Sequence, residues 1–390
     1  MSRFSHTPVF RPTHAEIDLE ALRHNGLWLQ KLAPHFFCPM VKSNAYGHGD
    51  VDVVKSLTEV GIETYGIALL EEALRLRTSN CKTQTLLMFG CFGKREAQYL
   101  HEHKITPVVK LWEEFEALEH AVPKTSAIPI HIKFDTGMAR MGFSVAEAEK
   151  LQEFLLKNPR FELLGVCSHL LQGEDMAVPM GMSFTQSQKL KELVSFFGPG
   201  PEYHLYNSSG ALSLWAHHRE DEIDLGFRPG IALYGVAPDM KFAHQQAQEK
   251  WKTLPLKPVM RLRTEVVSVR TVKKGDTVSY GGRWTAKQDS QVAVIPIGYA
   301  DGYSRKFSNC GQVLFRGQRV PVVGTVCMDY TLIDLTAASE SGISPLGEEV
   351  LLLGSQGSEH LDANEVASWS ETISYELLSC VGRRVPRKYN

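Results

Sequence analysis

Lys42 lies in the part of this sequence whose residue types point most directly to chemistry. A short apolar run, Phe36 to Val41, predicts a buried strand that ends on this lysine. The stretch Tyr46 to Gly49 then predicts a tight turn before a helical pattern over Val51–Val60. A buried amine is costly unless it is neutralised or paired. Covalent attachment to a carbonyl cofactor would neutralise it, whereas a side chain extended into solvent would avoid the cost.

A second cluster of cations follows another apolar run. In the segment His131 to Gly142, Lys133 and Arg140 both fall near one predicted strand end. Two cations buried together would repel each other unless an anion lay between them. The planar guanidinium of Arg140 suits a carboxylate ligand. A solvated surface pair is the alternative interpretation.

A third segment, Gly226 to Gly235, is rich in glycine and contains Arg228. Gly230 and Ile231 could offer backbone N–H groups to a phosphate, and Asn207 and Ser208 follow the preceding predicted strand. Arg228 stays charged at physiological pH. A buried arginine of this kind could contact a ligand or form a salt bridge, and the two would look the same in sequence.

These motifs, in this order, resemble those of the alanine racemases. Lys-x-Asn-Ala-Tyr-Gly-His-Gly at 42–49 is similar to the family's pyridoxal-phosphate lysine motif, and the resemblance runs from about Glu16 to Arg387. It implies pyridoxal 5'-phosphate as cofactor and an isomerase that interconverts L- and D-alanine by two bases, supplying D-alanine for peptidoglycan. Lys42 would hold the cofactor and act on the D-alanine side, and Tyr280 would act on the L-alanine side.

The resemblance also implies roles for further residues. His169, with Arg228 behind it, would lower the cost of a tyrosine anion. Lys133, a lysine that is often carbamylated in the family, would orient Arg140, which holds the substrate carboxylate together with Met328. Tyr299 and Arg305 would line the entrance. The expected cofactor contacts besides Lys42 are Tyr46, Asn207, Ser208, Arg228, Gly230, Ile231 and Tyr375.

The family resemblance implies a homodimer in which Tyr280 and Met328 of one subunit complete the site of the other. Two departures from the family pattern, the segment after His169 and Thr325 in place of a frequent arginine, are expected to border the entrance. Because of these two departures, a racemase that accepts amino acids other than alanine remains an alternative. A barrel-type amino-acid decarboxylase would prefer an acidic partner for the pyridine nitrogen, and a non-catalytic barrel that handles pyridoxal phosphate would lack the second domain.

The elements that position these residues follow two patterns. Short apolar runs alternate with amphipathic stretches in eight units between about residues 34 and 235, which favours an α/β fold of the (β/α)8 TIM-barrel type over an open doubly wound sheet. Such a barrel places its chemistry at the carboxyl ends of its strands. The eight predicted strands are Phe36–Lys42, Tyr65–Leu69, Thr85–Phe89, Thr106–Val109, Pro129–Phe134, Leu163–His169, Tyr203–Asn207 and Ile223–Arg228.

The pattern changes after a polar stretch at about 238–258, which is closed by two prolines and is expected to be a linker. The remainder predicts a mainly β domain, with strands over Met260–Arg270 and Val320–Val326 and a helix over Ala363–Cys380. A strand over Ala15–Leu19 is expected to join this domain. The expected domains are 12–240, which binds the cofactor, and 255–390, which carries the second base.

Composition narrows the classes of function. The formal net charge of −2 gives no electrostatic reason to expect nucleic acid or an anionic membrane as partner. No signal peptide or membrane-length apolar stretch is visible, so we expect a soluble cytoplasmic enzyme. The seven cysteines form no Cys-x-x-Cys pair, so the cysteines are expected to be reduced core residues. The histidines lack the spacing of metal ligands on a helix, so no metal is expected.

Overall fold

The computed structural model describes residues 10–33, 35–79, 81, 84–338 and 343–390. Two compact units make up the chain. The barrel unit comprises Ala21–Tyr46 and Asp50–Lys257, and the β unit comprises the residues up to Glu20, Gly47–Gly49 and Pro258–Asn390. The chain therefore leaves the barrel unit for three residues directly after the Lys42 segment.

Parallel strands form the core of the barrel unit, as the alternating pattern predicts. Their order in the sheet follows the sequence, and the apolar side chains of most of them are fully buried. The strands are β2 (Thr64–Ile67), β3 (Thr85–Met88), β4 (Thr106–Val109), β5 (Ile128–Asp135), β7 (Phe161–Cys167), β8 (Glu202–Tyr206) and β9 (Gly226–Phe227), with the short β6 (Phe143–Ser144) beside β5.

The run before Lys42 closes this sheet without forming a regular strand. It makes only isolated parallel bridges, Phe37 with Phe227 and Met40 with Gly66. The backbone N–H of Met40 donates to Pro229 O (2.8 Å) and that of Val41 to Gly66 O (2.8 Å). Pro39 has no N–H to continue a ladder, which explains why the predicted strand is reduced to an extended segment.

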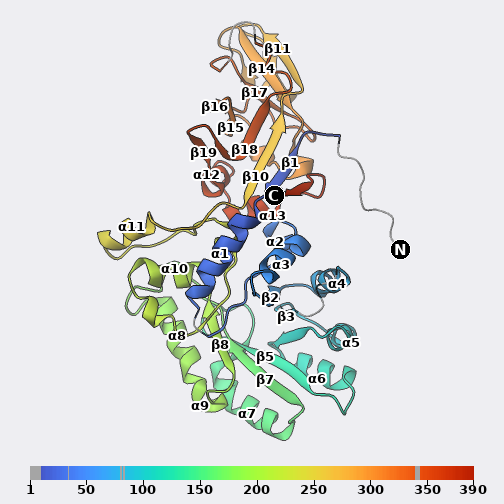
Figure 1. The fold of residues 1–390 in the computed structure, drawn as a ribbon, viewed down its shortest axis with the longest axis vertical. Helices are drawn as coiled ribbons and strands as arrows, with labels where there is room; N and C mark the ends of the chain where they lie inside the picture. The colour runs from blue at the N-terminus through green and yellow to red at the C-terminus, as the bar shows by residue number, and fades with distance from the viewer. Residues whose placement is uncertain (1–9, 34, 80, 82–83, 339–342) are drawn as a thin grey trace. The chain divides into compact units, whose positions relative to one another are not determined.

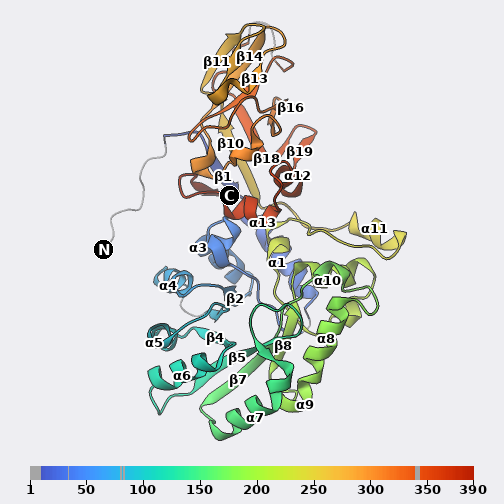
Figure 2. The same ribbon diagram turned by 180° about the vertical axis from the view of Figure 1, so that it is seen from behind.

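Helices cover the outside of these strands (Figures 1 and 2). The apolar face of α6 packs against its neighbours: the ring centroid of Phe115 lies 4.8 Å from that of Phe154 and 5.1 Å from that of Phe161. The helices are α3 (Asp50–Thr58), α4 (Leu70–Thr78), α5 (Lys94–Glu102), α6 (Trp112–Ala121), α7 (Ala148–Lys157), α8 (Met182–Glu192), α9 (Val194–Phe197) and α10 (Ser208–Ala216), while α1 (Leu19–Lys31) precedes the first barrel segment.

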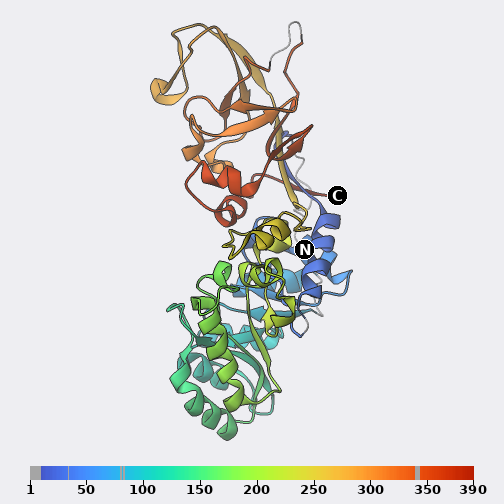
Figure 3. The ribbon, with the colours of Figure 1, turned by 90° about the vertical axis from the view of Figure 1, so that its left-hand side faces the viewer.

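The β unit is built from two sheets and a short hairpin, with α12 (Ala363–Ser368) and α13 (Ser374–Ser379) beside them (Figure 3). The strand β1 (His14–Ile17) pairs antiparallel with β10 (Met260–Glu265) and parallel with β20 (Arg387–Tyr389), so the strand predicted over Ala15–Leu19 joins the β unit but ends at Ile17, because Leu19 begins α1. The other strands are β11 (Ser268–Val272), β12 (Thr277–Val278), β13 (Trp284–Thr285), β14 (Ser290–Ile295), β15 (Gln312–Phe315), β16 (Gln318–Pro321), β17 (Thr331–Asp334), β18 (Glu349–Gln356) and β19 (Glu359–Leu361).

Several predicted elements of the β unit are interrupted. The strand expected over Met260–Arg270 divides into β10 and β11, which belong to different sheets. The strand expected over Val320–Val326 ends early, because β16 stops at Pro321. The helix expected over Ala363–Cys380 is two helices, since Glu371 adopts a left-handed backbone with φ of 56°.

The predicted linker also contains a helix. α11 (Gln245–Trp251) begins after His244, whose ring nitrogen accepts the backbone N–H of Ala247 at 3.1 Å. Its last residue, Trp251, packs at 5.9 Å from Phe242. The polar composition of this stretch gave no sign of a helix. The helix depends on one capping residue and one aromatic contact, which the composition does not reveal.

The barrel interior contains two buried histidines, His131 on β5 and His204 on β8, whose ring nitrogens lie 2.8 Å apart. Phe36 stacks on His204 at 4.6 Å. Gly165 on β7 provides the space for this pair, because a Cβ there would lie 2.1 Å from Nδ1 of His131. The glycine is therefore required by the polar interior and not by a turn.

A Gly165→Ala substitution tests this requirement. The methyl group would displace the His131 ring, so we expect the free energy of unfolding to fall by about 1–3 kcal/mol in urea denaturation. Gly200→Ala is the matched control, since a Cβ at Gly200 meets nothing within 4 Å. Equal stability of the two variants would contradict the assignment.

Candidate active site

The carboxyl ends of the barrel elements carry most of the sequence-predicted site residues. Lys42 follows the extended segment, Lys133 lies near the end of β5, and His169 follows β7 by two residues. Ser208 begins α10 directly after Asn207, and Arg228 follows β9. Since the carboxyl ends of parallel strands meet at one end of a barrel, this placement agrees with the sequence-based expectation.

A left-handed turn follows Lys42 immediately. Ser43, Asn44, Ala45 and Tyr46 have φ between 52° and 57°, a conformation that costs non-glycine residues roughly 1–2 kcal/mol each. Glu72 on α4 stabilises the turn by accepting the backbone N–H of Ser43 at 2.6 Å. Strain of this kind concentrates at functional sites, and here it fixes the direction in which the chain leaves the lysine.

Burial and nearby positive charges lower the pKa of both lysines in this region, Lys42 and Lys133. Burial lowers the pKa of the Lys42 amine, and the positive charge of Arg140 lowers it further, against an opposing effect of Glu72. Burial likewise lowers the pKa of Lys133, with Arg140 and Arg228 contributing. A lowered pKa leaves more of each amine neutral and nucleophilic.

His169 lies in the same positive field. Burial lowers its pKa well below the usual histidine value, and the charges of Arg228, Arg140, Lys133 and Lys42 add to that shift. The imidazole is therefore neutral over the physiological range. A site with this many cations is suited to anionic ligands such as a carboxylate or a phosphate.

Arg228 is buried without a carboxylate partner among the described residues. Its Nη1 donates to His204 Nδ1 at 2.7 Å, and its Nη2 donates to Ser168 O at 2.6 Å. An arginine can only donate, so Nδ1 of His204 accepts and its Nε2 carries the proton that bonds to His131. The pKa of His204 is lowered well below its usual value and that of His131 to about 3, both by burial first and by the charge of Arg228 second.

These two histidines were missed by the sequence reasoning. A signal for one of them existed: His131 and Lys133 are two residues apart on one strand and therefore share a face. No comparable signal singles out His204, because its significance depends on the contact with Arg228, which comes from another strand.

Three of the residues predicted to bind phosphate, Tyr46, Ser208 and Gly230, meet in the barrel unit. Oγ of Ser208 accepts the backbone N–H groups of Gly230 (3.0 Å) and Ala232 (3.2 Å). A Cβ on Gly230 would lie 2.4 Å from the Tyr46 hydroxyl, so only glycine permits this approach. The buried N-terminus of α10, capped by Asn207, adds a positive helix end. Because Oγ of Ser208 accepts both N–H groups, its own hydroxyl hydrogen is left to donate, and together with the positive helix end it fits the phosphate group of a cofactor such as pyridoxal phosphate.

A loop held by Asp135 carries Arg140. The carboxylate of Asp135 accepts the backbone N–H groups of Gly137, Met138 and Ala139 at 2.9–3.1 Å on one oxygen and that of Arg140 at 3.0 Å on the other. Burial alone would raise the pKa of Asp135, but these donors lower it. Arg140 is thus placed by its backbone, and its guanidinium is exposed to a ligand.

The remaining predicted residues belong to the β unit. Large exposed fractions mark Tyr280 (72%), Met328 (51%) and Tyr299 (43%), and Arg305 is also exposed. Tyr375 lies in the first turn of α13 and is half-buried. The predicted site residues are therefore divided between the two units of the chain.

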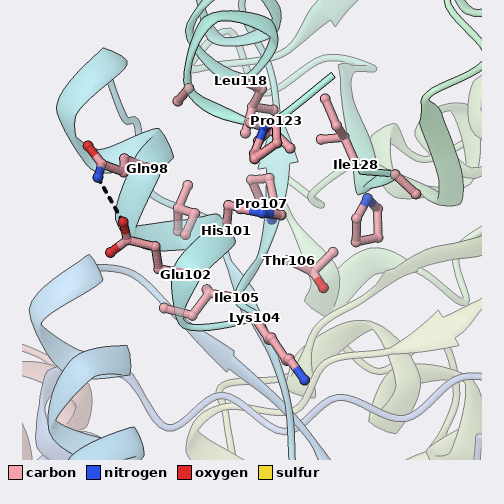
Figure 4. A pocket seen from close by; sticks show the side chains of 15 residues that line it. Gln98, His101, Glu102, Lys104, Ile105, Thr106, Pro107, Leu118, Pro123 and Ile128 are labelled. Carbon is pink, nitrogen blue, oxygen red and sulfur yellow. Dashed lines mark hydrogen bonds between the residues drawn. The ribbon is translucent and has the colours of Figure 1, made fainter. Parts of the chain in front are cut away.

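A cavity of about 840 Å³ lies away from these residues, between α5, α6 and the amino-terminal ends of β4 and β5 (Figure 4). Its lining is largely apolar and includes Leu118 and Ile128, and the Gln98 amide donates to Glu102 at its edge. None of the sequence-predicted site residues lines it. It lacks the cationic cluster described above and is not the candidate active site.

Other sequence-based expectations can be compared with the structure. Three of the seven cysteines, Cys91, Cys310 and Cys380, are exposed, contrary to the expectation that the cysteines lie in the core. All seven are free thiols. Within the described ranges no helix has the length and apolar character needed to cross a membrane, and no three His, Cys, Asp or Glu side chains gather where they could hold a metal.

Comparisons with known proteins identify the family. Residues 17–238 match the profile described as "Alanine racemase, N-terminal domain", and residues 259–389 match "Alanine racemase, C-terminal domain". An alanine racemase of Sorangium cellulosum is 36% identical over 395 residues, covering 97% of this chain and 99% of the relative. An alanine racemase of Geobacter sulfurreducens is 36% identical, with 97% of each chain covered.

Solved structures agree. Alanine racemase from Bacillus anthracis with bound L-Ala-P has a TM-score of 0.85 and 32% identity, covering 98% of this chain and 96% of its own. The enzyme from Bartonella henselae, solved with covalently bound pyridoxal phosphate, has a TM-score of 0.83 and 30% identity, covering 98% and 100%. Two family profiles and near full-length relatives all point the same way, and this chain belongs to the alanine racemase family.

Proposed function

We propose that this protein interconverts L-alanine and D-alanine with pyridoxal 5'-phosphate bound covalently to Lys42. The observation that carries the proposal is the lysine itself: a half-buried amine of lowered pKa, fixed by a strained turn, in a cluster of cations. Such an amine is suited to bond with an aldehyde. Pyridoxal phosphate, when bound, supplies an electron-withdrawing ring that acidifies the Cα–H bond of the amino acid.

The barrel residues hold the ligand groups around that bond. The Tyr46 hydroxyl, Ser208 and the backbone of Gly230 and Ile231 would hold the phosphate, and the contacts of Gly230 with Ser208 and Tyr46 support this grouping. Arg228 would lie beside the ring nitrogen of the bound cofactor, where its positive charge would keep that nitrogen unprotonated and favour racemisation over transamination. Asn207, which caps α10, and Tyr375 complete the cofactor contacts.

The cationic cluster also explains amino-acid binding. Arg140 binds the substrate carboxylate with the backbone of Met328, and a carbamate on Lys133 would supply the anion that separates Lys133 from Arg140. The lowered pKa of Lys133 supports carbamate formation, because the neutral amine is the form that reacts with carbon dioxide. Tyr299 and Arg305 line the entrance.

Two proton-transfer groups are required because racemisation removes a proton from one face of Cα and returns one to the other. Lys42 serves the D-alanine face and Tyr280 serves the L-alanine face. The neutral imidazole of His169, with the positive charge of Arg228 in its field, stabilises the tyrosine when it is deprotonated.

We further propose a homodimer in which Tyr280 and Met328 complete the partner's site. Their large exposed fractions, together with that of Tyr330 (50%), leave apolar surface on the β unit for a second copy to cover. A cytoplasmic location and a supply of D-alanine for peptidoglycan belong to the same proposal and are supported by family membership.

Alternative activities are weaker on specific grounds. A decarboxylase would need an acidic partner for the pyridine nitrogen, whereas the partners of Arg228 are a neutral histidine and backbone carbonyls. A broader amino-acid racemase differs only in side-chain tolerance, and turnover of serine, lysine and arginine compared with alanine separates it.

A Lys42→Ala variant tests the cofactor bond. Wild-type protein loaded with pyridoxal phosphate and reduced with borohydride should carry a stable mass increment on the peptide that contains Lys42, since reduction makes the bond permanent. The variant should carry none, whereas a variant of the exposed Lys124, Lys124→Ala, should behave as wild type. An adduct on another lysine would refute the assignment.

A Tyr280→Phe variant tests the second base. Racemisation should fall by about 10²–10⁴-fold, because one proton-transfer group is lost. Exchange of the Cα proton of D-alanine with D2O should continue, since Lys42 still serves that face. Measurement of both rates by NMR distinguishes loss of a base from loss of folding, and equal losses of both rates would contradict the division of labour.

Complementation tests the shared site. The inactive Lys42→Ala and Tyr280→Phe chains, unfolded together and reassembled, should regain about a quarter of wild-type activity, because half of randomly paired dimers are mixed and one of their two sites is intact. If each site used residues of one chain alone, the mixture would stay inactive.

A further inference from the structure

We infer that Thr325 is a positioning residue that holds the backbone of Tyr280 in place. The inference rests on the proposed role of Tyr280 as a base. The sequence predicts that Thr325 borders the entrance. The side chain is instead 1% exposed, so it lies inside the β unit behind the tyrosine.

The turn that carries Tyr280 cannot rely on side-chain packing. Its ring is 72% exposed, so it has few neighbours to fix it within the chain. The turn is also strained at Ser279, which has φ of 63°, whereas the two glycines that follow Tyr280 adopt φ of 75° and 54° without such a cost. A strained backbone keeps its conformation only when the surroundings over-determine it.

Thr325 and Ser279 supply that constraint through a reciprocal pair of hydrogen bonds. Oγ1 of Thr325 donates to the carbonyl oxygen of Tyr280 at 2.8 Å. Oγ of Ser279 donates to the carbonyl oxygen of Thr325 at 2.5 Å. Each side chain thus fixes the backbone of the other segment, and Tyr280 is held on both sides of its Cα.

The two segments are in close contact beyond these bonds. A Cβ on Gly324 would lie 2.8 Å from Cβ of Ser279. Asn309 bridges the far end of the turn, since its Oδ1 accepts the N–H of Gly324 at 2.6 Å and its Nδ2 donates to the carbonyl of Arg283 at 3.1 Å. The hydroxyl of Thr325 is the group in this frame that reaches Tyr280 itself.

The consequence concerns proton transfer. A base must lie within hydrogen-bond reach of Cα, and a loosened turn would place Tyr280 correctly for a smaller fraction of the time. Loss of the hydroxyl should therefore slow the step that Tyr280 performs and leave the step that Lys42 performs unchanged. A structural defect elsewhere would reduce both steps together.

The first test measures the turn in the absence of any ligand. Hydrogen–deuterium exchange of the peptide spanning residues 276–286 should be faster in Thr325→Val, which keeps the shape but removes the hydroxyl. Thr325→Ser should restore the wild-type exchange. Thr264→Val is the matched control, because Thr264 is also buried in the β unit and bonds to Thr13 instead. Unchanged exchange in Thr325→Val would overturn the inference.

The second test measures kinetics in both directions with Cα-deuterated alanine. We expect kcat of Thr325→Val to fall about tenfold. The isotope effect should rise with deuterated L-alanine, from which Tyr280 removes the deuteron, and fall with deuterated D-alanine, from which Lys42 removes it. Thr325→Ser should remain near wild type, and isotope effects that match wild type in Thr325→Val would refute a positioning role.

The outcomes separate this inference from the function on which it rests. Wild-type protein that fails to racemise alanine would remove the proposed function. Wild-type activity that is lost in Tyr280→Phe but intact in Thr325→Val would leave the proposed function standing and remove Thr325 as a positioning residue.

Discussion

The buried guanidinium of Arg228, with no carboxylate beside it among the described residues, is the constraint on which the rest of the barrel interior depends. Its charge is met by the ring of His204 and by backbone carbonyls, and it contributes to keeping His131 and His169 neutral. It also lowers the pKa of Lys133. A cation without a carboxylate partner leaves the region positive overall, which suits it to anionic ligands.

The β unit carries a side chain, that of Tyr280, which its own residues leave exposed. Tyr280 projects from a turn whose backbone is fixed by Ser279, Thr325 and Asn309. Rigidity in the backbone replaces packing of the ring. The barrel unit gathers positive charge, and the β unit holds the backbone of the tyrosine that we propose as a proton-transfer group.

Sequence alone predicted what depends on local patterns. The alternation of apolar runs and amphipathic stretches located the parallel strands, and β4 was predicted to the residue. Contacts between distant segments were less accessible: the approach of Gly230 to Tyr46, the pairing of His204 with Arg228 and the burial of Thr325 arise only when the chain is folded. Sequence patterns also failed where a single residue interrupts or begins an element: Pro39 interrupts a predicted strand, Glu371 divides a predicted helix, and His244 caps a helix that was not predicted.

Gly47, His48 and Gly49, which follow Tyr46, belong to the β unit, and residues of β20 contact the two glycines. The guanidinium of Arg387 donates to the carbonyl of Gly47 at 2.8 Å, and Gly49 leaves no room for a Cβ beside the Tyr389 hydroxyl. Tyr389 therefore packs against a residue that lies seven positions after Lys42 in the sequence. The hydrogen bond between Arg387 and Gly47 spans 340 positions of the sequence, so the chain directly after the Lys42 turn is held by a distant segment and not by its sequence neighbours.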